Sequence, residues 1–404
     1  MNTALAQSVK DAIRQELAPI VAIRRDLHKH PELSFHEERT SALVQRELAR
    51  LNIPYKAGLA GGTGVVAFIP ATETDPSTPS VALRADMDAL PITEQTALPY
   101  SSTRDGVMHA CGHDGHTAIL LGAARVLTSL HTRTNNVTLV FQPAEESGGG
   151  GQRFCAEGML EGSHGSGIGP RVARIFGLHG WPSLRLGTVK TKPGPLMAST
   201  DEFLITVRGK GGHAARPHLA RDPIVAASAI VMSLQTIVSR STSPVDSAVC
   251  TIGRIQGGTV DNVIPEAVEL EGTTRALTPE MRALAEARLR EIADAVARAH
   301  GCSADIHWNV GYPVVHNDHN LTQRFFELAR KILGDESALL AETPVMGGED
   351  FAYYAQRIPA CFFFLGLCPK GDASYPEIHT PRFDFNDNAI PTGIELMTRL
   401  ALEN

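Results

Sequence analysis

The sequence predicts an α/β fold, in which a larger domain with a mostly parallel sheet carries an inserted ferredoxin-like α+β domain. The first observation is length. A domain usually has about 100 to 200 residues, so a chain of 404 residues is too long for one ordinary core. The second is an alternation of short apolar and amphipathic segments near both ends of the chain, which is typical of a parallel sheet covered by helices. The third is a middle part with a different order of elements, β-α-β-β-α-β.

Residues 1–188 are predicted to form the first part of the larger domain. Apolar residues recur at helical spacing from Val9 to Ile20, and Pro31 separates this helix from a second one over residues 36–51. Apolar runs typical of buried strands then alternate with helical patterns, in the order strands 65–69 and 81–83, helix 117–130, strand 137–141, helix 152–160 and strand 172–178.

Residues 189–308 are predicted to form the inserted domain, and residues 309–404 complete the larger one. The elements of the insertion are strand 202–208, helix 223–239, strands 248–255 and 267–274, helix 279–300 and strand 304–308. The last part of the chain returns to α/β character with helix 320–333, strand 360–367 and helix 389–400. Insertions are tolerated where chain ends lie close together, so an interrupted larger domain is physically reasonable.

Composition and charge exclude several classes of function. The chain has 37 basic and 44 acidic residues, a net charge of -7, so we expect no basic surface for nucleic acid or an anionic membrane. No run of about 18 apolar residues could span a bilayer, and the first residues lack the apolar core of a signal peptide. Six cysteines without framework spacing indicate reduced thiols. We therefore expect a soluble, cytoplasmic protein.

The strongest local signal is the segment HACGHDGH at residues 109–116. Cys111 and His113 lie two residues apart beside glycines, so a thiolate and an imidazole can point at one ion from a flexible turn. The alternative is a polar loop that caps the following helix, with Asp114 as N-cap. No second pair of Cys or His follows at the spacing of a zinc finger, so further ligands must come from distant segments.

Three distant segments supply candidate ligands where a predicted strand ends. VALRADMDALP places Asp86 and Asp88 after one strand, VTLVFQPAEE places Glu145 and Glu146 after another, and RIFGLHGWP places His179 after a third. In open α/β sheets, ligands bind outside the carboxyl ends of the strands. These side chains and the Cys-His loop are therefore expected to meet at one edge of the sheet.

The adjacent Glu145 and Glu146 are expected to have different roles. Neighbouring side chains diverge, so one carboxylate can coordinate an ion while the other acts as general base toward a water. The alternative for such a pair is a solvated surface or a helix N-terminus. Four glycines at residues 148–151 suggest a close approach of the backbone, because no GK[ST] sequence follows them as in a phosphate-binding loop.

Four other residues are weaker candidates. His379 lies in PEIHTPRFDF, and His213 lies in the Gly-rich segment GKGGHAARP of the insertion. Asn262 in DNVIPE and Arg275 in EGTTRAL could clamp a substrate carboxylate, the Arg by its bidentate fork. The alternative for His379 is an ordinary loop histidine. The alternative for His213, Asn262 and Arg275 is hydrogen bonding at the surface.

Together these motifs resemble those of one enzyme family. RRDLHKHPELSFHE, RADMDALP, HACGHDGH, FQPAEE, GLHGWP, GGHAARPH, DNVIPE, GGEDF and IHTPRFDFND follow one another in the order seen in N-acyl amino acid amidohydrolases of the hippurate hydrolase and auxin-conjugate hydrolase type. That type is a branch of the aminoacylase and carboxypeptidase superfamily of dinuclear metallohydrolases. The resemblance covers nearly the whole chain and implies a catalytic larger domain with a lid or dimerisation domain inserted in it.

The resemblance implies a role for each candidate residue. The implied ligands of two divalent ions (Mn, Zn, Co or Ni) are Cys111, His113, Glu146, His179 and His379. Glu145 matches the general base. Asp88 matches a catalytic residue that orients a ligand, and Asp86 stands where the wider superfamily has a metal-binding His. His213 matches a residue that reaches the partner's active site across a dimer, and Asn262 and Arg275 match carboxylate-binding positions.

The function implied is hydrolysis of the amide bond of N-acyl amino acids, with a water activated by the ions and by Glu145. A homodimer, or a tetramer, through the inserted domain is implied as well. The alternatives are a carboxypeptidase or dipeptidase, an N-acetyl-diaminopimelate deacetylase, a metal-free binding protein on this scaffold, and a cysteine hydrolase with Cys111 as nucleophile.

Overall fold

The computed structural model describes residues 3–370, 372 and 374–403, and the chain forms two compact units. The larger unit comprises Met1–Gly194, His316–Glu342 and Asp350–Asn404, and the smaller unit comprises Pro195–Val315 and Thr343–Glu349. The sequence predicted the insertion at residues 189–308 and did not foresee that Thr343–Glu349 belongs with it. That the smaller unit serves as a lid or for dimerisation stays a prediction.

The larger unit is built on a mixed sheet. Among the described residues, the strands lie in the order β1 (Tyr55–Leu59), β2 (Gly64–Ile69), β4 (Val137–Gln142), β3 (Ser80–Asp86), β5 (Val172–Arg185), β16 (Ala360–Cys368), β6 (Val189–Thr191) and β15 (Ala338–Leu340). The central strands β4, β3, β5 and β16 are parallel, whereas β1, β2 and β6 pair antiparallel with a neighbour. The predicted α/β class is confirmed. Besides the central strands, the edge strand β15 also pairs parallel with β6, and the antiparallel pairs are β1 with β2, β2 with β4 and β6 with β16. The connection between β1 and β2 is short, and such a connection permits only antiparallel pairing.

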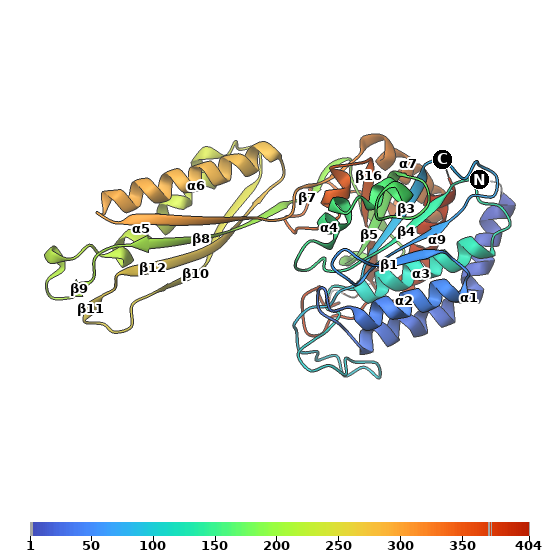
Figure 1. Cartoon of the computed structure of the whole chain (residues 1–404), viewed down its shortest axis with the longest axis horizontal. Helices are drawn as coiled ribbons and strands as arrows, with labels where there is room; N and C mark the ends of the chain where they lie inside the picture. The colour runs from blue at the N-terminus through green and yellow to red at the C-terminus, as the bar shows by residue number, and fades with distance from the viewer. Residues whose placement is uncertain (1–2, 371, 373, 404) are drawn as a thin grey trace. The chain divides into compact units, whose positions relative to one another are not determined.

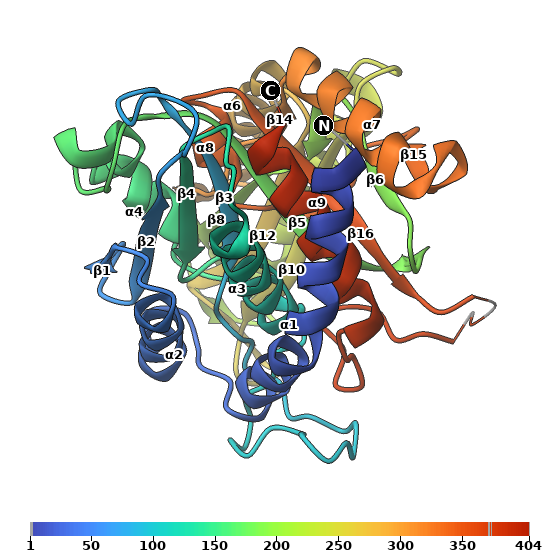
Figure 2. The same ribbon diagram turned by 90° about the vertical axis from the view of Figure 1, so that its right-hand side faces the viewer.

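Helices cover this sheet (Figure 1). Their bounds are α1 (Thr3–Lys29), α2 (Glu38–Arg50), α3 (His113–Ser129), α4 (Gly150–Ala156), α7 (His319–Leu333), α8 (Ala352–Ala355) and α9 (Ile390–Leu402). Figure 2 shows α1, α3 and α9 together in front of the strands; α3 and α9 contact β3 and β5, and α1 packs on both helices. A Cβ at Gly122 of α3 would lie 2.4 Å from Ile394, and one at Gly393 of α9 would lie 2.5 Å from Ile119. The two glycines therefore allow the close packing of α3 and α9.

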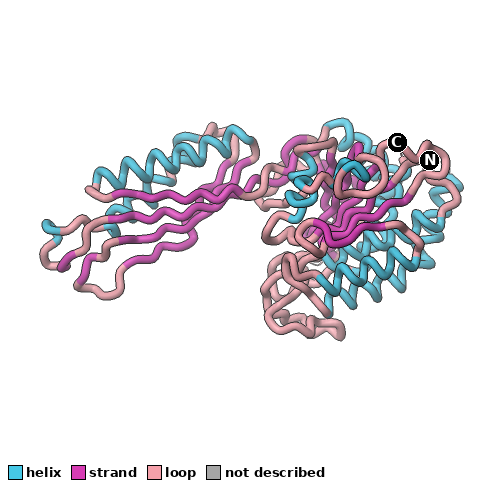
Figure 3. The backbone as a smooth tube through the Cα atoms, in the orientation of Figure 1, coloured by secondary structure: helices cyan, strands magenta, loops and turns pink. Residues whose placement is uncertain are grey.

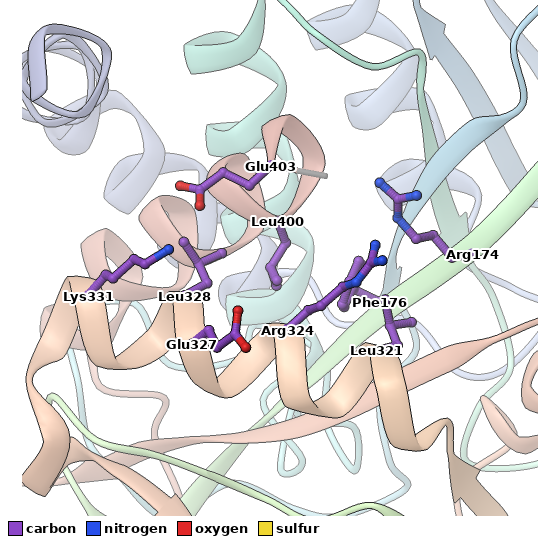
Figure 4. A pocket seen from close by; sticks show the side chains of 9 residues that line it. All are labelled: Arg174, Phe176, Leu321, Arg324, Glu327, Leu328, Lys331, Leu400 and Glu403. Atoms are coloured by element: carbon purple, nitrogen blue, oxygen red, sulfur yellow. The ribbon is translucent and has the colours of Figure 1, made fainter. Parts of the chain in front are cut away.

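Helix α7 closes another part of the core. Leu321 and Leu328 of α7 lie near Leu400 of α9 and Phe176 of β5, and Arg174 lines the same small pocket (Figure 4). Arg174 is near the beginning of β5, and none of the pocket-lining residues is a candidate site residue. This pocket is therefore separate from the chemistry predicted for the carboxyl ends of the strands.

The smaller unit is built on a four-stranded antiparallel sheet, which helices cover (Figure 3). The strands lie in the order β10 (Ala248–Gly257), β12 (Ala267–Ala276), β8 (Ser199–Arg208) and β13 (Ser303–Val310). Helices α5 (Pro223–Leu234) and α6 (Pro279–Ala299) contact each other and the strands β8 and β12. The short strands β9 (Gly212–His213) and β11 (Val263–Ile264) pair with each other, and the strands β7 (Gly194–Met197) and β14 (Val315–Asn317) fall at the boundaries of the unit in the sequence. The long elements follow in the order β-α-β-β-α-β.

One helical stretch, Pro223–Ser241, is long and apolar enough by length and composition to cross a membrane. The stretch is not an uninterrupted apolar run, because polar residues such as Ser228 and Gln235 divide it. The buried residues of α5, including Ala226 and Ile230, belong to the core of the smaller unit. A single helix of this kind is weak evidence for a membrane span.

Candidate metal centre

Several of the predicted site residues lie at or just after the carboxyl ends of central strands. β3 ends at Asp86 and β4 at Gln142, so Asp88 and the Glu145-Glu146 pair come directly after neighbouring parallel strands. His179 differs from the prediction, because it lies inside β5 and not after its end. The strand continues to Arg185 because β16 pairs with it beyond the predicted boundary, with Phe364 opposite His179.

The Cys-His loop leads directly into α3. Gly112 has a φ of 91° and is the N-cap of this helix, which begins at His113. The alternative in which Asp114 caps the helix is therefore wrong. Asp114 lies in the first turn, fully buried, where it pairs with Arg24 at 3.0 Å and with Nδ1 of His28 at 2.8 Å. Only a residue without a side chain readily adopts the backbone of Gly112, so the glycine and not the aspartate determines where the helix starts.

The structure brings the five predicted ligands together in the larger unit. Donor atoms of Cys111, His113 and His179 lie within 4.8 Å of one another, and the same holds for Cys111, Glu146 and His379. The Cys111 Sγ is 3.2 Å from the His179 Nε2, and the His379 Nε2 is 3.4 Å from the Glu146 Oε1. The backbone N–H of His379 donates to the carbonyl of Ala110, which fixes the C-terminal loop beside the Cys-His loop.

Hydrogen bonds orient the lone pairs of two histidines toward the same space. The His113 Nδ1 lies 3.1 Å from the Asp88 Oδ1, and the His179 Nδ1 lies 2.8 Å from the carbonyl oxygen of Gly180. Each Nδ1 therefore carries the hydrogen, which leaves Nε2 as a donor to a metal. The His113 Nε2 and the Glu146 Oε1 are buried without a hydrogen-bond partner in the part of the chain that the structure describes. Buried atoms of this kind are normally satisfied, so a bound cation fits this position.

The electrostatics of the cluster also fit a cation. Burial, together with the carboxylates of Glu146 and Glu145, raises the pKa of the Cys111 thiol well above its usual range. Burial lowers the pKa of His113, but Asp86 and Asp88 outweigh it and raise this pKa to about 10. Without a metal, the site therefore holds protons on the thiol and the imidazole, and metal binding must release them. Thiolate, imidazole and carboxylate together suit Zn, Mn, Co or Ni.

Glu145 lies beside this cluster, on a loop whose backbone is fixed by a hydrogen bond to Glu37. Its carboxylate is within 4.8 Å of donor atoms of His113 and Glu146, and the residue is 6% exposed. The preceding residue, Ala144, has a φ of 54°, and its N–H donates to the buried carboxylate of Glu37 at 2.9 Å. Glu37 was not singled out from the sequence, although it ends the HPELSFHE segment. Burial raises the pKa of Glu37 to about 7.

The two aspartates after β3 have different surroundings. Asp88 contacts His113 through Oδ1, and its Oδ2 accepts from the Ser34 hydroxyl at 2.7 Å and from the Glu146 N–H at 3.0 Å. Asp88 thus joins one ligand side chain to the backbone of another. The Asp86 Oδ2 pairs with Arg84 at 2.6 Å, and its Oδ1 lies 2.7 Å from the His116 Nδ1.

Replacing Asp88 by asparagine is expected to weaken metal binding about 10- to 100-fold, because the neutral amide holds His113 less firmly and lowers its basicity. Competition with a graded series of chelators measures this affinity. The control is D105N, because Asp105 is exposed and belongs to no part of the cluster. Equal metal affinity in D88N and the unsubstituted protein would contradict the orienting role of Asp88.

A buried ionic network behind the donors was missed at the sequence level. Arg84 pairs with Asp86 and also with Asp350 at 2.9 Å, and Gln142 contacts Arg84 and Asp350. The signal in the sequence is an arginine near the end of strand β3, every residue of which is buried. A charge in such a strand requires a partner, but the sequence does not say which acid supplies it.

Three predicted residues lie in the smaller unit. His213 is in β9 opposite Val263, and the N–H of Ala214 donates to the carbonyl of Asn262. Arg275 is in β12, half-buried, and its guanidinium donates to the carbonyl of Thr274 at 2.9 Å. Their roles toward the substrate stay predictions.

Comparison with known proteins identifies similar chains. The sequence pattern of the peptidase family M20/M25/M40 matches residues 82–403. The chain is 41% identical to an N-acetyl-L-cysteine deacetylase from Bacillus subtilis, over 92% of this chain and 84% of that protein. It is 39% identical to the IAA-amino acid hydrolase ILR1-like 4 from Arabidopsis thaliana, over 95% and 84%. Among solved structures, the YXEP protein of Bacillus subtilis, described as a dinuclear metal-binding peptidase of the M20 family, matches with a TM-score of 0.81 and 36% identity, over 96% of this chain and 98% of that one.

Proposed function

This chain belongs to the peptidase family M20/M25/M40 and is a metal-dependent amidohydrolase, and we propose that it hydrolyses N-acyl amino acids to a carboxylic acid and a free amino acid. One observation carries the proposal. Five side chains able to ligate metal converge with the buried carboxylate of Glu145 in one unit. A binding protein would have no need of a general base at this place.

We propose that Glu145 moves the proton in this reaction. Two divalent ions held by Cys111, His113, Glu146, His179 and His379 would supply Lewis-acid activation of water and of the substrate carbonyl. Glu145 accepts a proton from the attacking water, whose oxygen adds to the acyl carbon. As the C–N bond breaks, Glu145 returns this proton to the leaving nitrogen, so the products are a carboxylic acid and an amine.

Residues of the smaller unit complete the proposed site. His213 from a second copy of the chain would donate a hydrogen bond to the oxyanion of the tetrahedral intermediate, a contribution of about 3 to 4 kcal/mol by analogy with other single donors. Asn262 and Arg275 would hold the carboxylate of the amino acid.

A substrate screen tests the proposal. The protein is loaded with Mn, Zn, Co or Ni and offered hippurate, N-acetyl amino acids, indole-acetyl amino acids, N-acetyl-diaminopimelate and dipeptides. We expect hydrolysis of N-acyl amino acids with at least one metal. Hydrolysis of dipeptides alone would favour a peptidase, and metal binding without hydrolysis of any compound would favour a binding protein.

We also propose that the protein is a homodimer formed through the smaller unit. Met232 and Val225 on α5 are 72% and 52% exposed, and Ile255 on the edge strand β10 is 55% exposed. Exposed apolar side chains beside an unpaired strand edge are typical of an interface between copies.

We propose a cytoplasmic location for the protein. The free thiols of its cysteines support this location, because the cytosol keeps thiols reduced.

The substitution M232K is expected to convert the dimer to a monomer, because it puts a charge on exposed apolar surface of α5 close to Ile255 of β10. Light scattering measures the mass in solution. L340K is the matched control, because Leu340 is 60% exposed on the larger unit. A monomeric unsubstituted protein with full activity would contradict both the dimer and the role of His213.

A further inference from the structure

His116 is the third histidine of HACGHDGH, and it lies buried behind the metal-binding donors. It belongs to the first turn of α3, three residues after His113. Its Nδ1 is 2.7 Å from the Asp86 Oδ1, and its Nε2 accepts the N–H of Gly180 at 2.8 Å. His116 thereby joins three separate elements: the end of β3, the start of α3 and the middle of β5.

These two contacts determine the tautomer of His116. The N–H of Gly180 can only donate, so the Nε2 of His116 must present a lone pair. The ring hydrogen is therefore on Nδ1, where it is donated to Asp86. With both ring nitrogens engaged, His116 has no lone pair left for a metal, although it lies near His113.

These contacts lead on to His179, a proposed metal ligand. The carbonyl of Gly180 accepts the Nδ1–H of His179, which turns the His179 Nε2 toward the Cys111 Sγ at 3.2 Å. The rings of His116 and His179 are 4.8 Å apart, and Phe385 packs edge-on against His116. A Cβ on Gly180 would lie 2.7 Å from Phe385, so only a glycine at this position allows Phe385 to pack so closely against β5.

Asp86 is fixed at the other end of these contacts. Arg84 holds its second oxygen at 2.6 Å, and the hydroxyl of Thr117 donates to its backbone carbonyl at 2.7 Å. The carboxylate can therefore hold the imidazole of His116 in one orientation without itself moving.

We propose that His116 is a positioning residue, which transmits the fixed position of Asp86 to Gly180 and so orients the ligand His179. This inference rests on the proposed function, because it concerns the same metal centre. Asp86 then acts through His116 and is not itself a metal ligand or a catalytic residue. His116 positions one ligand as Asp88 positions another, but it does so through the main chain of β5.

Two substitutions separate the contacts of His116. In H116N, the side-chain amide can still donate to Asp86 but cannot reach Gly180. In H116Q, the side-chain oxygen can accept the N–H of Gly180, while the contact with Asp86 is lost. The control for lost stability is F325L, because Phe325 is fully buried in the core of the larger unit, where its ring contacts Phe326 and Phe363.

The measurements are metal content during titration with a chelator, the absorption spectrum of the Co-loaded protein, and the melting temperature. We expect H116N to hold one of two ions at least 10-fold more weakly and to change the thiolate-to-cobalt band of Cys111. H116Q is expected to hold this ion more weakly than the unsubstituted protein but less weakly than H116N does, because it keeps the contact with Gly180 and loses the one with Asp86. F325L is expected to melt lower with unchanged metal affinity and spectrum.

Other outcomes overturn the inference. Unchanged affinity and spectrum in folded H116N would show that His179 needs no positioning by His116. Equal loss of an ion in H116N and H116Q would make His116 a ligand instead. These results differ from failure of the proposed function, which would appear as an unsubstituted protein that binds no metal or hydrolyses no N-acyl amino acid.

Discussion

Replacing Glu145 by glutamine is expected to lower kcat about 10²- to 10⁴-fold, with metal content and KM little changed. Glutamine fills the same space but cannot take a proton from water. Steady-state kinetics on a substrate found in the screen measures the effect, and metal analysis of the same sample shows whether the site is intact. E161Q is the control, because Glu161 is exposed and distant in sequence from every donor.

The neighbouring substitution E146Q separates the two adjacent carboxylates. The Glu146 Oε1 lies 3.4 Å from the His379 Nε2 and 3.9 Å from the His113 Nε2, so its replacement is expected to reduce metal affinity together with activity. Full activity in E145Q would overturn the assignment of Glu145 as base. Loss of metal in E145Q and normal metal content in E146Q would exchange the two roles.

Removal of metal by a chelator is expected to abolish hydrolysis, and one or more of Mn, Zn, Co and Ni to restore it. The residues Cys111 and His113 carry protons when no cation is present, because burial and nearby carboxylates raise the pKa of each. Metal binding near neutral pH should therefore release protons, which calorimetry in buffers of different ionisation enthalpy can count. Activity that is unaffected after complete removal of metal would contradict the proposed mechanism.

Alkylation of the metal-free and metal-loaded forms tests the alternative in which Cys111 is a nucleophile. A nucleophilic cysteine needs a lowered pKa, whereas burial, Glu146 and Glu145 raise the pKa of Cys111. We expect iodoacetamide to react with Cys111 more readily in the metal-free protein than in the metal-loaded protein, so that metal added after this treatment no longer restores activity. Equal inactivation of both forms, with activity that needs no metal, would favour the cysteine hydrolase.

Helical and strand periodicity located nearly all of the long elements, but some boundaries required the tertiary structure. The predicted strand at residues 172–178 continues to Arg185, because β16 supplies backbone partners for the added residues. The helix predicted from residue 117 begins at His113, because Gly112 adopts a left-handed backbone immediately before it. The end of β5 depends on β16, a strand far away in the sequence, so the residues around this end do not indicate where it lies.

The sequence by itself determined the kinds of donor and the loops that carry them, because thiolate, imidazole and carboxylate side chains follow apolar strands whose ends must share one edge of a sheet. The tertiary structure alone decided which nitrogen of each histidine faces the metal, and that Asp86 pairs with Arg84 and His116 while Asp88 holds His113. It also brought Asp350 to Arg84, 266 positions earlier in the chain. The physical reason is that a hydrogen bond depends on the relative position of two elements, and only packing of the whole unit determines that position.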